Sequence, residues 1–399
     1  MLLPLGDAPN PRGVPFMTYL LIGANIALYV LITVPLSAEP ANPSDPLLPE
    51  YREVVSRSLP RGASPAEVLR HISAYDLFVF RHGFRPIAPA LPNLFWSLFL
   101  HAGLLHLVGN MLFLWIYGDN VEHRLGRVRY VVGYIGTGIA ATLFHTVFNP
   151  DSPLPLIGAS GAISGVLGFY FVWFPHNQVR LLVLLAPFFM NVFLVSSRLV
   201  LGMYLVLDNI VPFLVSRGVG GGVAHGAHIG GFIAGLAAAW VIDRREVTAR
   251  PAEFRGADAV DTRGDAGPTL RSLIRSGRFD EAARLYFAQG AGATRGALNP
   301  DDLLTLADWL ARNGHAKAAL SVYLRHLRDF PHDPRTAEAH LGAGQIEMAS
   351  LGQAASAYQH FLDALDLDPS PEVAKEARAA LHAIESMQKR QVGHTRAGC

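Results

Sequence analysis

The chain has 399 residues, of which 51% are hydrophobic and 16% charged, and its mean hydropathy is +0.27. Soluble domains carry about 25% charged residues, so this composition excludes a disordered chain, a collagen and a wholly soluble enzyme. The formal net charge is +1, and no basic stripe indicates nucleic-acid binding. The one cysteine, Cys399, is the last residue, which excludes an intramolecular disulfide.

Six apolar segments precede residue 243, and each can hold the roughly 20 apolar residues that cross a bilayer as a helix. The first is too long and unbroken for a signal peptide and lacks a basic start. A long loop, about residues 37–94, follows it, and we expect partly helical structure there at the membrane surface. The six expected spans are Met17–Leu36, Phe95–Tyr117, Tyr130–Phe148, Leu156–Phe174, Val195–Val215 and His225–Ile242.

The stretch Val179–Leu214 is apolar for nearly its whole length but contains Pro187, Arg198 and Asp208. It fits either one span preceded by an interfacial segment or two short spans. The choice decides from which membrane face the last helix starts.

Positive charge in short loops indicates the cytoplasmic side. The connection 149–155 has no basic residue, which places the start of the fourth span at the outer face. We therefore expect an integral multi-pass protein with both termini in the cytoplasm. The lack of a transit peptide or eukaryotic sorting signal in the sequence favours a bacterial inner membrane. The basic residues behind this prediction are Arg124, Arg127, Arg129, Arg180, Arg244 and Arg245.

The composition changes after the last span. We expect an N-terminal tail over residues 1–16, a charged linker over 243–268, helical repeats over 269–389 and a tail over 390–399. Gly277, Gly314 and Gly352 recur with small and aromatic residues at matching positions after them, which resembles tetratricopeptide repeats. A generic helical bundle is the alternative. The repeats are expected either to bind a cytoplasmic protein or peptide, or to be an appendage without a ligand.

One candidate nucleophile opens the fourth span, in Gly158-Ala159-Ser160-Gly161. The first N–H groups of a helix are unpaired, and the helix dipole favours negative charge there. A serine at this place can therefore both attack a carbonyl and help to hold an oxyanion. The alternative is ordinary helix packing, because small residues spaced four apart are common at helix contacts in membranes.

Histidines in the spans are the other candidates, because an ionisable group at membrane depth is costly. His228 lies in a glycine-rich stretch with Gly231 and Gly235, so a close approach to the glycine-rich fourth span is expected. His225 is expected nearer the membrane surface. His106 and Asn110 are four residues apart and share a helix face, whereas His101 precedes them. His106 and Asn110 can both donate hydrogen bonds to an oxyanion. The alternative is a structural polar cluster that holds helices together.

Metal ligation is not expected in the membrane part. Nine histidines precede residue 250, but no HExxH pattern exists, and the sixth span has no acidic residue. We therefore predict no metal site and no cofactor.

Taken together, the motifs resemble the rhomboid family of intramembrane serine proteases over about residues 17–242. The resemblance rests on four elements in order: the second-span motif from His101 to Asn110, Gly118 to Gly126 with Glu122 and Arg124, Gly158-Ala-Ser160-Gly161, and Ala227-His228-Ile-Gly-Gly231. It implies an all-α fold, with a six-transmembrane-helix bundle followed by a soluble helical-repeat domain that is TPR-like.

The resemblance also implies roles. Ser160 is the nucleophile and His228 the general base of a dyad without a third acid, while His106, Asn110 and the Ser160 N–H form the oxyanion hole. Glu122 and Arg124 form a structural pair, and Gly158, Gly161, Gly231 and Gly235 are structural. Substrates would be single-span membrane proteins in the lipid bilayer. The alternative function is a proteolytically inactive relative that binds transmembrane clients or partners.

Two positions depart from the family pattern. Well-known members carry a Trp-Arg pair in the first loop where this chain has Pro92-Asn93, with Trp96 nearby. Some members also place an aromatic residue one turn after the nucleophile, stacked on the catalytic histidine. This chain has Ser164 there, so a different group must orient His228.

Overall fold

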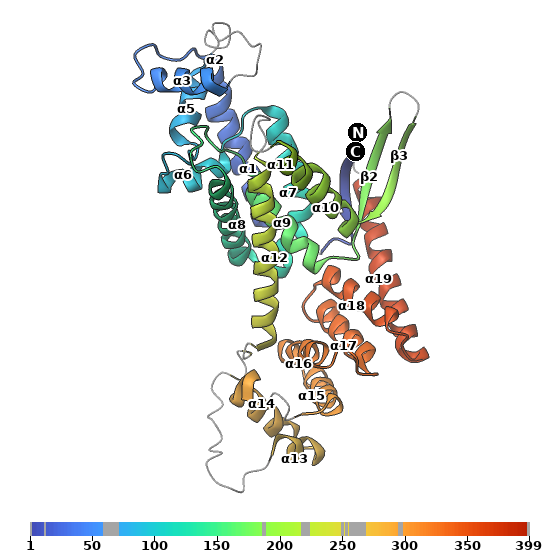
Figure 1. Cartoon of the computed structure of the whole chain (residues 1–399). Coiled ribbons are helices and arrows are strands. Elements are labelled where there is room, and N and C mark those ends of the chain that lie inside the picture. The colour runs from blue at the N-terminus through green and yellow to red at the C-terminus, as the bar shows by residue number, and fades with distance from the viewer. Residues whose placement is uncertain are drawn as a thin grey trace. The chain divides into compact units, whose positions relative to one another are not determined.

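The computed structural model describes most of the chain (Figure 1). The chain divides into two compact units, Met1–Asp7 with Gly13–Ala239, and Ala8–Arg12 with Trp240–Cys399. Cys399, Pro187 and most of the expected linker at 243–268 lie outside the described residues. The described residues are 2–11, 13–58, 72–185, 189–216, 224–248, 251, 254, 269–293 and 298–396.

The first unit is mostly helical, as the all-α expectation requires, and it also contains strands that the sequence did not predict. Two short π-helices and a 3-10 helix interrupt its α-helices. Its elements are β1 (Leu2–Ala8), α1 (Phe16–Leu28), η1 (Tyr29–Thr33), α2 (Val34–Ala38), α3 (Leu48–Ser58), α5 (Ala74–His82), α6 (Leu91–Trp96), η2 (Ser97–Phe99), α7 (Leu104–Leu125), α8 (Arg127–Phe148), α9 (Ser160–Trp173), β2 (Gln178–Leu185), β3 (Phe189–Ser196), α10 (Ser197–Leu205), η3 (Val206–Ile210), α11 (Val211–Ser216) and α12 (His225–Thr248).

Helices lie in all six expected segments, but they are not equally able to cross a membrane. Among the described residues, four are long and apolar enough: Phe16–Ala38, Arg127–Phe148, Ser197–Val215 and His225–Arg245. A fifth counts if Leu91–Phe99 and Leu104–Leu125 form one broken span. Length and composition therefore support an integral membrane protein with four or five spans rather than establishing six.

The second expected span, Phe95–Tyr117, is broken rather than continuous. Its two helical parts meet at 88°. The break at residues 100–103 has a clear cause, since the hydroxyl of Tyr75 donates to the carbonyl of His101 (2.8 Å) and accepts from its N–H (3.2 Å). The backbone groups of His101 are thus satisfied by a side chain instead of by a helix.

The fourth expected span also differs from its predicted bounds, because α9 begins at Ser160 and not at Leu156. Gly158 has a φ of +122°, which lies outside helical geometry, and its N–H donates to the carbonyl of Ser97 (2.8 Å). The helix has 14 residues, and from Gly161 to Tyr170 every residue is buried. Among the helices around it, α9 is therefore the central one, with its first turn next to an ordered loop.

The ambiguous stretch Val179–Leu214 contains a hairpin and a single helical rod. Strands β2 and β3 pair antiparallel from Gln178↔Ser196 to Leu185↔Phe189, and β1 completes a sheet in the order β1-β2-β3. Figure 1 shows this sheet beside the helices of the same unit. The rod Ser197–Val215 follows directly and is long and apolar enough for one span, which favours one span over two short ones. The interfacial position of the segment before it stays a prediction.

A buried polar network fixes the first strand to the helices. Asp7 is 3% exposed, and its carboxylate accepts hydrogen bonds from the hydroxyl of Tyr170 and from Nδ2 of Asn120 (2.9 Å). Nδ2 of Asn177 donates to the same hydroxyl (2.8 Å). Burial raises the pKa of Asp7 to about 7. A segment expected to be a tail is thus partly a strand with a buried anchor.

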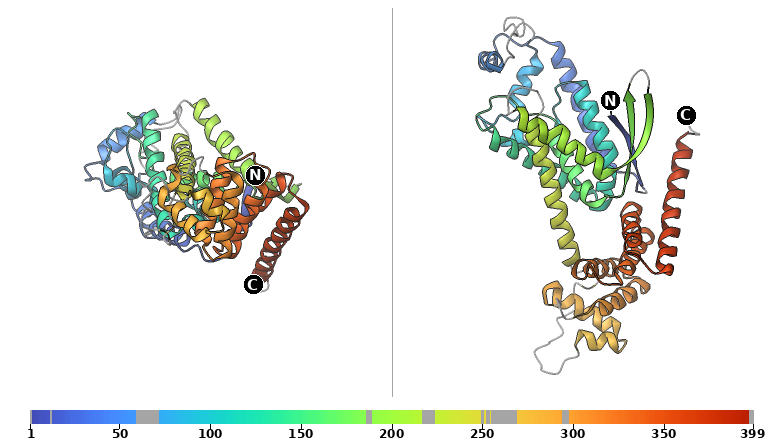
Figure 2. Two further views of the ribbon diagram at one scale, coloured as in Figure 1. Left: turned by 90° about the horizontal axis from the view of Figure 1, so that it is seen from below. Right: turned by 45° about the vertical axis from the view of Figure 1, so that its right-hand side comes forward.

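The second unit consists of helices in pairs, which Figure 2 presents in two orientations. Gly277, Gly314 and Gly352 lie in the turns inside the three pairs, with φ values of +76°, +81° and +68°. Assignment to the tetratricopeptide family stays a prediction. The helices are α13 (Leu270–Arg275), α14 (Phe279–Ala293), α15 (Pro300–Arg312), α16 (Ala316–Asp329), α17 (Thr336–Ala349), α18 (Ala354–Asp366) and α19 (Pro371–Arg396).

Candidate active site

Ser160 and His228 lie within hydrogen-bond distance, although 68 residues separate them. Ser160 is the first residue of α9, and His228 is in the first turn of α12. Oγ of Ser160 is 2.8 Å from Nε2 of His228. Both residues are half-buried. The pair has the geometry in which an imidazole accepts the proton of an attacking hydroxyl.

Asn209 determines which ring nitrogen of His228 carries the proton. The amide Nδ2 of Asn209 donates to the carbonyl of Tyr204 (2.9 Å), so its oxygen Oδ1 faces Nδ1 of His228 at 2.6 Å. An amide oxygen only accepts, and Nδ1 must therefore carry the proton. Nε2 then presents its lone pair to Ser160. This is the role that a carboxylate has in a triad, performed here by a neutral side chain.

The position of Asn209 depends on a local irregularity in the helix. It lies in the π-helix η3, where the wider turn places its amide opposite the carbonyl five residues earlier. Such π-turns are frequent at functional sites. Asn209 is 1% exposed, so its amide is held away from lipid.

Tyr204 forms a second support for the imidazole. Its ring is stacked near that of His228, with centroids 6.4 Å apart and planes at 28°. Its hydroxyl is 3.1 Å from Oγ of Ser164. The serine that replaces the expected aromatic residue on α9 thus contacts an aromatic side chain supplied by α10.

His106 and Asn110 come from one face of α7. A Cβ added to Gly158 would lie 2.8 Å from Cε1 of His106 and 3.7 Å from Oγ of Ser160, so the imidazole occupies the space beside the serine. Asn110, one turn further, is 8% exposed, and among the described residues its Nδ2 has no hydrogen-bond partner. An unpaired buried donor next to this site can serve a developing negative charge.

Glycines bring α9 and α12 together. A Cβ on Gly231 would overlap the carbonyl oxygen of Gly161, and one on Gly235 would overlap that of Gly165. On the other side of α9, a Cβ on Gly161 would be 2.8 Å from Cβ of Ala141. The short distance between Ser160 and His228 thus rests on backbone-to-backbone contact.

The remaining sequence candidates lie at the edge of the site or away from it. His101 is 1% exposed and its ring is 5.1 Å from that of His106, while the half-buried His225 is 6.4 Å from His228 by ring centroid. Glu122 accepts hydrogen bonds from the N–H groups of Met17 (2.9 Å) and Thr18 (2.7 Å). It thereby caps the start of α1.

Arg124 contacts the aromatic part of α9. Its guanidinium lies 4.8 Å from the ring centre of Trp173. Glu122 thus connects α7 to α1, and Arg124 connects α7 to α9. The expected pairing of Glu122 with Arg124 stays a prediction.

Sequence reasoning missed Asn209 and Tyr204. A signal was present, because a polar amide inside an otherwise apolar span is costly and points to function. Asp208, which interrupts the same span, was noted instead, and its side chain is exposed.

Comparisons with known proteins agree with this arrangement. Residues 89–245 match the Rhomboid domain. The match includes Ser160, His228, His106 and Asn110, and begins after α1 and most of the long first loop. It supports membership of the rhomboid family and, with it, an integral membrane protein from a family of intramembrane proteases.

Similar curated proteins carry rhomboid names. Rhomboid protease GluP of Bacillus subtilis is 45% identical over 69 residues, 17% of this chain and 13% of the relative. Rhomboid protein 1, mitochondrial, of Saccharomyces cerevisiae is 37% identical over 95 residues, 23% and 28%. RHOMBOID-like protein 4 of Arabidopsis thaliana is 32% identical over 143 residues, 36% and 32%. The chain thus spans less than a third of the length of these relatives. No solved structure matches.

Proposed function

We propose that this protein is an intramembrane serine endopeptidase that hydrolyses peptide bonds in or near transmembrane segments. The observation that carries the proposal is the 2.8 Å distance between Oγ of Ser160 and Nε2 of His228, with Asn209 on the other ring nitrogen. A packing serine needs neither contact. The rhomboid match over the same residues supports the proposal independently.

The reaction follows from this geometry. Nε2 of His228 takes the hydroxyl proton while Oγ of Ser160 attacks the scissile carbonyl. The resulting oxyanion is held by the Ser160 N–H, His106 and Asn110, and losing one such donor typically costs about 3 kcal/mol. His228 then protonates the leaving amine, and water hydrolyses the acyl-enzyme.

The substrates we propose are single-span membrane proteins. Their helix ends must unwind, because a carbonyl that is hydrogen-bonded in a helix is shielded from attack. The half-buried positions of Ser160 and His228 leave the pair accessible to an extended segment.

Cleavage of a single-span reporter in detergent or liposomes tests the proposal. Ser160→Ala and His228→Ala should each lower the rate by at least about 1,000-fold, and a fluorophosphonate probe should label the wild type but not Ser160→Ala. The exposed serine of α2 provides a matched control, Ser37→Ala, which should cleave normally. Equal cleavage by wild type and Ser160→Ala would favour the inactive, client-binding alternative.

We further propose a bacterial inner-membrane protein with both termini in the cytoplasm, a protease unit over 17–242 and a linker over 243–268. The basic residues near the cytoplasmic ends of the spans support this orientation. Since Cys399 is the one cysteine, a Cys399→Ser background allows single-cysteine labelling. A cysteine at Asp151 should react with an impermeant reagent from outside, and one at Gly126 should not.

For the repeats over 269–389 we propose a protein or peptide ligand. An apolar pocket of about 370 Å³ between α17, α18 and α19 supports this, with Met348, Phe361 and Met387 in its lining. Deletion of residues 266–399 should remove co-purifying proteins. If activity and co-purifying proteins are both unchanged, the repeats are an appendage without a ligand.

A further inference from the structure

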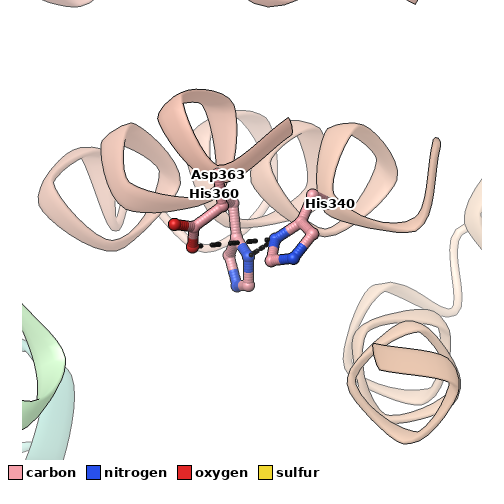
Figure 3. A group of neighbouring side chains, drawn as sticks. All are labelled: His340, His360 and Asp363. Atoms are coloured by element: carbon pink, nitrogen blue, oxygen red, sulfur yellow. Dashed lines mark hydrogen bonds and ion pairs between the residues drawn. The ribbon is translucent and has the colours of Figure 1, made fainter. Parts of the chain in front are cut away.

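Two histidines and an aspartate converge between α17 and α18 in the second unit. His340 comes from α17, and His360 and Asp363 come from α18. Figure 3 shows the three side chains directed toward one another. Each offers a ligand atom, and these atoms all lie within 4.8 Å of one another. We propose that His340, His360 and Asp363 form a binding site for a divalent transition-metal ion, with zinc as the ion that fits best.

The distances suit one ion. Nδ1 of His340 is 2.9 Å from Nδ1 of His360 and 3.8 Å from Oδ2 of Asp363. Zinc binds imidazole and carboxylate at about 2.0–2.2 Å, so two ligand atoms on a tetrahedral ion lie about 3.3 Å apart. One observed distance is shorter than this value and the other is longer, so small side-chain rotations are enough to bring the ligand atoms to that separation.

The helices present the ligands in register. His360 and Asp363 are three residues apart, so they project from the same face of α18. This i, i+3 spacing also occurs in metal sites built between the helices of bundles. His340 faces them from α17, and an ion would therefore connect the two helices of one repeat.

The three proposed ligands are partly buried, but solvent can reach them. The side chains of His340 and His360 are 16% and 15% exposed, and that of Asp363 is 39% exposed, so ions can enter from the solvent side. An imidazole coordinates a metal ion through its neutral form, so the site should bind the ion more tightly as pH rises. Three protein ligands leave one position of a tetrahedral ion for water.

Glu347 extends the site beyond the ligands. It lies two turns after His340 on α17, is 2% exposed, and its Oε2 is 3.9 Å from Nε2 of His360. Metal-binding histidines commonly direct their second ring nitrogen to a carboxylate, which orients the ring and strengthens the bond. Glu347 is thus a positioning residue for His360 once Nδ1 binds the ion.

The spacing of these residues explains why the sequence did not predict the site. The expectation of no metal rested on the histidines before residue 250 and on the absence of HExxH. His340 and His360 are 20 residues apart on different helices, and only the packing of α17 on α18 brings them together.

The test is zinc binding to the full-length protein in detergent, in a Ser160→Ala background so that proteolysis has no influence. The protein is stripped with EDTA, dialysed and titrated with ZnCl₂ by calorimetry. We expect one tight equivalent, which weakens by at least about 100-fold in His340→Ala or His360→Ala and by about 10-fold in Glu347→Gln. His382→Ala, an exposed histidine on α19, is the matched control and should bind as the parent does.

Two further readouts separate loss of ligands from loss of fold. Asp363→Asn keeps the side-chain shape, and it should alter the visible absorption of bound Co²⁺ while the far-UV circular dichroism stays constant. Zinc should raise the thermal midpoint of the parent but not that of the histidine variants. The proposal is overturned if the parent has no tight equivalent, or if His340→Ala and His382→Ala bind zinc equally well. In that case the two imidazoles only share a hydrogen bond.

Discussion

Glycines chosen from the two units of this protein illustrate two different uses of the residue. In the first unit, which contains the apolar helices and is called the membrane unit below, Gly231 and Gly235 lie against the backbone of α9. A Cβ at either position would overlap that backbone, so the absence of a Cβ is what the fold requires there. In the helix pairs of the second unit, Gly314 has open space around its Cβ position but a φ of +81°. Its value is conformational freedom. At these positions the same residue type thus permits close packing in one case and chain reversal in the other.

Polar and charged side chains also differ between the two units, in how deeply they are buried. In the second unit, Arg335 pairs with Glu338 (2.5 Å) and Asp301 (3.1 Å) at partly exposed positions. Each such pair adds little stability. In the membrane unit, polar side chains such as Asn209 and Asp7 are buried and hydrogen-bonded. A substitution of the same kind should therefore have a larger effect in the membrane unit.

The largest effect is expected from a methyl group at the contact between α9 and α12. Gly235→Ala should destabilise the protein by about 3 kcal/mol and abolish cleavage, because the separating helices pull His228 away from Ser160. The readouts are the thermal midpoint in detergent and the reporter assay. Gly202→Ala on α10, where nothing lies within 4 Å, is the control and should be neutral. A Gly235→Ala protein as stable as this control would refute the packing argument.

The next effect concerns the orientation of the imidazole. Asn209→Ala should lower kcat by about 100-fold with little change in KM, because Nδ1 loses its acceptor and the ring can adopt the wrong tautomer. Asn209→Asp keeps an acceptor oxygen and should recover part of the rate. Asp208→Ala, an exposed neighbour in the same π-helix, should be normal. If all three variants turn over equally, His228 is oriented by another group.

A smaller effect is expected from pH. Burial raises the pKa of Asp7 in the folded state from 3.8 to about 7, so the folded protein holds a proton that the unfolded chain has released. The contribution of Asp7 to stability is therefore fully present below its unfolded pKa of 3.8 and is lost as pH rises through the folded pKa. Between about pH 5.5 and about pH 7.5 the loss should be about 2 kcal/mol. Asp7→Asn should flatten the profile of thermal midpoints. A parallel profile would contradict the shift.

The smallest effect on stability is expected from a substitution in the second unit. Gly314→Ala should cost about 1 kcal/mol, because an L-residue is strained at this φ, whereas Gly314→Asn should cost less. Hydrogen exchange of the α15 and α16 amides in the full chain measures the local change. Reporter cleavage should be unaffected by either variant. Equal protection in wild type and Gly314→Ala would mean that the turn tolerates a side chain.

Hydropathy and motif spacing anticipated much of this molecule. Apolar runs gave the positions of the helices, and the stretch around Ser160 was expected at a helix start, where α9 begins. The pairing of β2 with β3 was not anticipated, because a continuous apolar run such as Leu181–Leu185 has no alternation to separate strand from helix. The strand β1 was missed because its partner lies about 170 residues away.

The candidate site was anticipated in its residues but not in its supports. Ser160, His228, His106 and Asn110 stand out because each is polar in an apolar span. Asn209 and Tyr204 act on His228 only through the π-helix and the packing of α10, which no local pattern encodes. The same holds for His340 and His360, which meet through tertiary packing.

The first strand has a consequence for the order in which the molecule is built. β1 precedes its partners in the chain: β2, which pairs with it, and Tyr170 and Asn177, which contact Asp7, follow more than 160 residues later. Helices α1 to α9 are therefore synthesised while β1 is still unpaired. Closing the sheet is then among the last steps for this unit, and a chain interrupted before residue 185 exposes an unpaired strand edge to cellular quality control.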